Sequence, residues 1–234
     1  MTHSFFPQDS QAAPVPSVPS RAETLGDAAV HLVGLAAALV AVPVLVTLAA
    51  QWHGNVTALL ATGIYGATLI AMLVCSALYH HMPRPDWKPW LLRLDHSAIY
   101  LKIAGTYTPF ALLSGGAGGG LVAGLWGAAV AGCGLHVFAL GRARWPGFAL
   151  YLGMGWAGLV LGWSLFATLS PAVLALIVAG GVIYTIGTAF FLWENLPFHT
   201  AIWHGFVLLA SVLFFVAVTL HLSDTALGTA VPVL

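Results

Sequence analysis

Histidine and aspartate side chains stand inside long apolar stretches of this sequence, where an ionisable group costs about 3 kcal/mol and needs a reason. Neutral imidazoles and carboxylates are ligands of zinc, and catalytic zinc sites use about three protein ligands and a water. Ser76 and His80 are four residues apart and share a helix face. Asp95 and Lys102 are seven residues apart and also share a helix face, so they would be able to form an ion pair. The candidates inside these stretches or at their edges are His31, His80, His81, Asp95, His96, Lys102, His136, His199, His204 and His221.

The stretches that must position these residues are those of a membrane protein. Of 234 residues, 60% are hydrophobic and only 6% are charged, whereas a soluble domain has about 25% charged residues. Seven basic residues balance seven acidic ones, so no nucleic-acid partner is expected. The apolar runs are long and unbroken, which excludes the short alternating strands of a membrane barrel. The composition therefore predicts an all-α integral membrane protein.

Seven apolar segments are close to the ~20 residues that a bilayer requires. Short breaks rich in turn-forming residues separate them, so consecutive spans should be antiparallel neighbours. We predict a seven-helix transmembrane domain over residues 27–234 and a flexible tail over residues 1–26, which is rich in Pro, Ser, Ala and Gln. The predicted spans are 28–50, 56–80, 90–113, 119–140, 148–169, 172–193 and 199–222.

The basic residues predict the orientation of the bundle. Cytoplasmic loops carry an excess of Lys and Arg, and the tail and the even-numbered loops hold six of the seven basic residues. The N-terminus should therefore be cytoplasmic and the C-terminus outside. The tail shows no basic segment followed by an apolar core, so the first span should be an uncleaved anchor.

This topology gathers the ionisable groups in the cytoplasmic half of the membrane. The second span ends there at His80, the third begins there with Asp95 and His96, and the seventh begins there with His199 and His204. Groups from separate helices that converge in this way would form a metal site. The alternative is that these histidines only reach toward the interface or cap helix ends.

Three segments resemble the haemolysin III family of bacteria: SALYH (76–80), RLDHSAIYLKIAGTYTPF (93–110) and AIWHGFVLLAS (201–211). The resemblance extends from about Glu23 to the C-terminus. This family belongs to the progestin and adipoQ receptor superfamily, which includes the adiponectin receptors, and it is more distantly related to the alkaline ceramidases. The resemblance implies a seven-helix bundle in the bacterial inner membrane, with a cytoplasmic N-terminus and a zinc ion in the cytoplasmic half.

The resemblance also implies functions for particular residues. Ser76 and His80 match a Ser and a His of the family's second span, and Asp95 matches an Asp of its third span. His204 matches the second of two histidines that are four residues apart on the seventh span. The implied metal ligands are therefore His80, His204 and Asp95.

The first histidine of that pair is replaced, because Thr200 stands four residues before His204 and the nearest histidine is His199. Positions five apart diverge by about 140° on a regular helix. His199 would face the same ion as His204 only if the helix start is irregular, as Pro197 or a π-bulge would allow. Otherwise water completes the ligand set, or His96 or His136 substitutes.

The resemblance favours a zinc-dependent hydrolase that acts on membrane lipid, with ceramide-like amides as the implied substrate class. Zinc lowers the pKa of a bound water and polarises a carbonyl. Asp95 would orient the water or act as general base, and Ser76 would hydrogen-bond to the water or to a developing oxyanion.

Three other functions compete with this hydrolase. A structural zinc in a non-enzymatic sensor or homeostasis protein of membrane lipid requires a closed set of protein ligands, and Thr200 leaves the set one short. Cytolytic pore formation, for which the family is named, is poorly supported by a chain without an export signal. A retinal-based pump requires a lysine in the last span, and residues 199–222 contain none.

Overall fold

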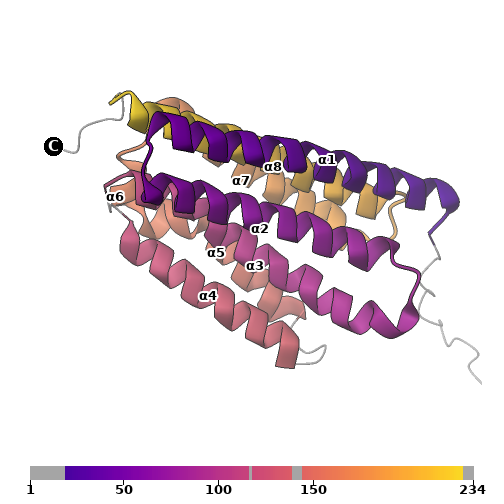
Figure 1. Cartoon of the computed structure of the whole chain (residues 1–234). Helices are drawn as coiled ribbons and strands as arrows, with labels where there is room; N and C mark the ends of the chain where they lie inside the picture. The colour runs from indigo at the N-terminus through magenta and orange to yellow at the C-terminus, as the bar shows by residue number, and fades with distance from the viewer. Residues whose placement is uncertain (1–18, 116–117, 139–143, 229–234) are drawn as a thin grey trace, which may run out of the picture.

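The computed structural model describes residues 19–115, 118–138 and 144–228, and these parts form helices that run back and forth along one axis (Figure 1). The described residues contain no strand, which confirms the all-α prediction. The elements are α1 (Arg21–Trp52), α2 (Val56–His81), the 3-10 turn η1 (Pro85–Trp87), α3 (Lys88–Leu113), α4 (Gly119–Phe138), α5 (Arg144–Leu161), α6 (Trp163–Phe166), α7 (Pro171–Leu192) and α8 (His199–Ala226).

Each predicted span corresponds to a helix, and the first and fifth spans differ most from the observed bounds. α1 begins at Arg21, so residues 21–26 are helical although they were assigned to the flexible tail. The reason is a capping box: Ser20 Oγ accepts from Glu23 N at 3.2 Å, and Glu23 Oε2 accepts from Ser20 N at 2.7 Å. The predicted fifth span, 148–169, is divided between α5 and α6 at Gly162, which has non-helical dihedral angles. The rest of the predicted tail, residues 1–18, lies outside the described residues.

Length and hydropathy support a protein that crosses the membrane several times. Seven described helices have 18 or more residues. Five of them, α1, α2, α4, α7 and α8, are long and apolar enough to cross a membrane. α3 carries Lys88, Arg93, Asp95 and Lys102, and the apolar part of α5 is shorter. The count of seven spans and the orientation of the termini stay predictions.

Close helix packing sets how the helices face one another. α3 packs against α2, α4, α5 and α8, and α1 packs against α2 and α8. A Cβ atom at Gly105 on α3 would lie 2.1 Å from Thr68 Oγ1 on α2, and one at Gly66 would lie 2.2 Å from Val42 Cγ1 on α1. Small residues are therefore required where these backbones approach.

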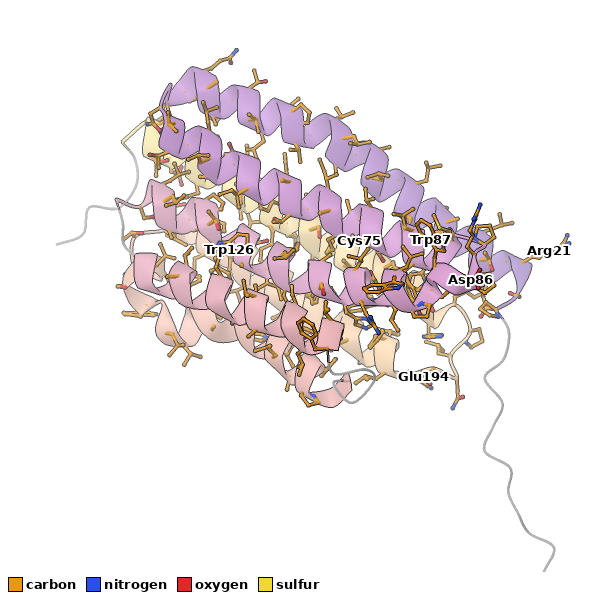
Figure 2. The ribbon with its side chains drawn as sticks, turned by 60° about the horizontal axis from the view of Figure 1, so that its bottom comes forward. Arg21, Cys75, Asp86, Trp87, Trp126 and Glu194 are labelled. Carbon is orange, nitrogen blue, oxygen red and sulfur yellow. The ribbon has the colours of Figure 1, made fainter. Side chains whose placement is uncertain are left out.

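The polar linkers gather at one end of the bundle. Figure 2 places Arg21, Asp86 and Glu194 at the same end, where α1 begins and where the α2–α3 and α7–α8 linkers lie. This is the end at which α2 finishes with His80 and His81 and α8 begins with His199. His80, His81 and His199 are therefore brought to the same end of the molecule, as the sequence predicted.

Candidate metal centre

Six polar side chains from three helices form a histidine cluster in the half of the bundle near this end. The cluster consists of Asp27 and His31 on α1, Ser76, His80 and His81 on α2, and His204 on α8. Asp27 and His31 are four residues apart on one helix face, as are Ser76 and His80. Asp27, His31, Ser76 and His204 are at most 9% exposed.

The carboxylate of Asp27 is the negative charge around which the imidazoles collect. His204 Nδ1 donates to Asp27 Oδ1 at 2.6 Å, and His81 Nε2 lies 3.2 Å from Asp27 Oδ2. His80 Nδ1 lies farther away, 3.9 Å from the same Oδ2. A buried carboxylate needs such donors because it has lost its water.

The hydroxyl of Ser76 lies between two imidazoles. Its Oγ is 3.1 Å from His31 Nε2 and 3.4 Å from His204 Nε2. The Nδ1 of His31 is 2.9 Å from the carbonyl oxygen of Asp27, so both rings donate their Nδ1 protons to Asp27. In a neutral imidazole the other nitrogen then carries a lone pair. Two Nε2 lone pairs therefore face one hydroxyl, which has a single proton to give.

This arrangement fits a metal ion. A cation would satisfy the Nε2 lone pair that Ser76 leaves without a donor. Metal-binding histidines usually donate their other ring N–H to a carboxylate or a backbone carbonyl, as His31 and His204 do. One donor atom from each of Asp27, His31 and His204 lies within 4.8 Å of the other two. The cluster is thus a buried group that could hold a metal ion.

A large cavity adjoins the cluster. It has a volume of about 710 Å³, and its lining is mainly apolar. Its wall combines polar side chains with apolar residues such as Met72, Leu73, Ile99 and Val207. The polar residues are His31, Ser76, Tyr79, His80, Arg93, Asp95, His96, His136, Tyr151, Tyr184, His199, Thr200 and His204.

The structure brings together three of the residues predicted from sequence. Ser76, His80 and His204 belong to the histidine cluster, and the rings of His80 and His204 are 4.6 Å apart. Asp95 lines the same cavity, where it interacts with the Ser76 hydroxyl and with His204.

His199 lies on the cavity wall, where its Nε2 contacts Thr200 Oγ1 at 3.3 Å. The chain is irregular just before the helix, because Phe198 has a φ of 60°, but α8 is already helical at His199. The Nδ1 of His199 is buried without a hydrogen-bond partner. The proposed substitutes His96 and His136 stack on each other, with their centroids 4.9 Å apart.

Sequence reasoning missed Asp27 because the first span was predicted to begin at residue 28. The available signal was its spacing of four residues from His31, the pattern used for Ser76 and His80. The suggested ion pair between Asp95 and Lys102 is replaced by another contact. The Nζ of Lys102 lies over the ring of Phe214, 4.6 Å from its centroid.

The sequence of the chain is similar to known proteins over most of its length. Residues 21–215 match the family model described as haemolysin-III related. The chain is 38% identical over 208 residues to Hemolysin-3 of Bacillus cereus, covering 87% of this chain and 94% of the relative. It is 35% identical over 201 residues to the Hemolysin-3 homolog of Bacillus subtilis (strain 168), covering 85% and 94%. The protein therefore belongs to the haemolysin III family.

Proposed function

We propose that this protein is a zinc-dependent hydrolase of lipid amides, embedded in the bacterial inner membrane with seven spans and a cytoplasmic N-terminus. The observation that carries the proposal is the position of the histidine cluster, which opens onto a mainly apolar cavity of about 710 Å³. A metal with a merely structural function does not need such a space. Ligand sites of enzymes have volumes of about 300–1,000 Å³ and combine apolar walls with a few polar groups.

Zinc bound in the cluster would lower the pKa of a bound water to about 7 and polarise a substrate carbonyl. His204 and His31 would hold it through their Nε2 atoms, which face the same point near Ser76. Asp27 would keep both rings in the required tautomer, because it accepts both Nδ1 protons. His80, whose ring is 4.6 Å from that of His204, would be a further ligand.

Ser76 and Asp95 would act on the reacting groups. The Ser76 hydroxyl is adjacent to both Nε2 atoms, so it would donate a hydrogen bond to the developing oxyanion. Asp95 lies on the cavity wall close to Ser76, and as general base it would accept a proton from the attacking water. The proton would then go to the leaving amine, which completes hydrolysis of the amide.

The apolar walls indicate the substrate class. Leu73, Ile99 and Val207 would contact an acyl chain, and the polar side chains of the histidine cluster would contact the amide. A membrane lipid would reach the cavity from the surrounding bilayer. Ceramide-like amides satisfy both requirements, and they are the substrate class that the family resemblance implies.

Metal content and turnover test the proposal together. The full chain is purified in detergent, its zinc per chain is determined by mass spectrometry, and fatty acid release from ceramide is measured. We expect His204→Ala to lose both zinc and turnover, and Asp95→Ala to keep zinc and lose turnover. His53→Gln is the matched control, because His53 lies at the opposite end of the bundle, bonded to the Leu222 carbonyl. A zinc-loaded wild type that hydrolyses no lipid amide would refute the hydrolase.

The hydrogen-bonded network itself favours a second candidate, a structural zinc in a membrane-lipid sensor. Asp27, His31, Ser76 and His204 satisfy one another through four contacts, as in a closed structural site. In that case zinc removal would lower the unfolding temperature, and the zinc-loaded protein would have no turnover.

A further inference from the structure

A buried lysine lies on α3, away from the histidine cluster. Lys102 is 3% exposed. Its Nζ lies 4.6 Å from the ring centroid of Phe214 and 5.8 Å from that of Tyr184. The side chain lines a second cavity of about 70 Å³, which residues of α3, α5, α7 and α8 enclose.

This ammonium group has no carboxylate beside it. Within the described parts of the chain, no aspartate or glutamate forms an ion pair with Lys102. Asp95, the nearest acidic residue in sequence, is seven positions away on the same helix, which corresponds to about 10 Å along the axis. The Asp95 carboxylate is therefore a poor counter-ion for Lys102.

Three hydroxyl groups around the second cavity already donate hydrogen bonds to backbone carbonyls. Thr106 Oγ1 donates to the carbonyl of Lys102 at 2.7 Å, Tyr107 OH donates to the carbonyl of Gly155 at 2.6 Å, and Thr185 Oγ1 donates to the carbonyl of Gly181 at 2.7 Å. Their oxygen lone pairs can accept a hydrogen bond from the Lys102 ammonium group, but they supply no negative charge.

The free-energy cost of burying the Lys102 ammonium group favours a negative charge that does not come from the protein. A desolvated cation–π contact contributes about 2 kcal/mol. Burying an ammonium group costs several kcal/mol in a real protein even after relaxation. The rings of Phe214 and Tyr184 thus offset only part of the cost, and a counter-charge beside the ammonium group would offset more of it through direct attraction.

We propose that the second cavity binds a small monovalent anion of the size of chloride, with Lys102 as its charge partner. A water molecule occupies about 30 Å³ of liquid, so a cavity of about 70 Å³ has room for an ion of that size with a water. Gluconate is too large to enter. Tyr151 and Tyr184 line both cavities, so the anion site lies next to the cavity of the histidine cluster.

The test uses the full chain in lipid nanodiscs and radiolabelled chloride. We expect one saturable chloride per chain, displaced by bromide and not by gluconate. Thermal unfolding should occur at a higher temperature in sodium chloride than in sodium gluconate at the same ionic strength. Both effects should disappear in Lys102→Met.

Lys88→Met is the matched control. Lys88 is the other lysine of the sequence, and its Nζ donates to the carbonyls of Tyr79 and His80 at the end of α2. This variant should bind chloride as the wild type does. Lys102→Gln provides a second neutral variant in case Lys102→Met does not fold. Absence of saturable chloride binding in the wild type, or unchanged binding in a folded Lys102 variant, would overturn the proposal.

Discussion

Asp27→Asn is the substitution that most directly tests how the histidine cluster works. It keeps the shape of the side chain but removes the charge and one of two acceptor oxygens. The carboxylate accepts from His204 at Oδ1 (2.6 Å) and is 3.2 Å from His81 Nε2 at Oδ2. An asparagine has one carbonyl oxygen and can keep only one of these contacts.

The expected effect of Asp27→Asn is a moderate loss of zinc affinity. Removing the group that orients a metal-binding histidine typically weakens metal affinity by about 10–100-fold. This corresponds to about 1.4–2.8 kcal/mol of binding free energy. The loss should be smaller than in His204→Ala, because Asp27→Asn leaves the Nε2 atoms of His31 and His204 in place.

Competition with a chromophoric zinc chelator in detergent, at one fixed pH, measures the affinity. The pH is fixed because metal binding displaces protons from the ligands. Asp86→Asn removes the same charge from an exposed residue of η1 at the same end of the bundle, and should bind zinc as the wild type does (Figure 2). Wild-type affinity in Asp27→Asn would show that Asp27 does not orient the imidazoles. A loss of zinc affinity in Asp27→Asn as complete as in His204→Ala would show that Asp27 is itself a ligand.

Three further substitutions have distinct expected outcomes. Thr200→His places a histidine four residues before His204, on the same face of α8, so zinc should bind more tightly in the chelator assay; unchanged affinity would place this face away from the ion. Ser76→Ala removes the hydroxyl between the Nε2 atoms of His31 and His204. This variant should retain zinc, while its turnover of a lipid amide falls by about 100-fold or more. Turnover equal to that of the wild type would show that Ser76 takes no part in the reaction. Gly105→Ala places a Cβ atom 2.1 Å from Thr68 Oγ1, so it should destabilise the fold by about 1–3 kcal/mol in thermal unfolding. Gly124→Ala meets nothing within 4 Å and should not be destabilised; an equal loss in both would contradict the packing argument.

Much of the fold could be predicted because helix length and hydropathy are local properties. Each predicted span corresponds to a helix, since an apolar run of about 20 residues satisfies its backbone only by forming one in a bilayer. The boundary at Arg21 was missed although its signal is also local, because the capping box of Ser20 and Glu23 lies within a segment of tail-like composition. The break at Gly162 was missed because a glycine in an apolar run does not by itself end a helix.

The candidate site was predictable only in part. Antiparallel spans place Ser76, His80 and His204 at the same depth, and the sequence alone determined this. Their contacts with Asp27 and His31 depend on which face each helix turns toward its neighbours. That rotation is set by packing between helices, such as Gly66 of α2 against Val42 of α1, and no helix encodes it alone. The tertiary structure therefore decided that Asp27 is the centre of the cluster, and that Lys102 turns toward Phe214 rather than pairing with Asp95, because both depend on side chains far apart in sequence.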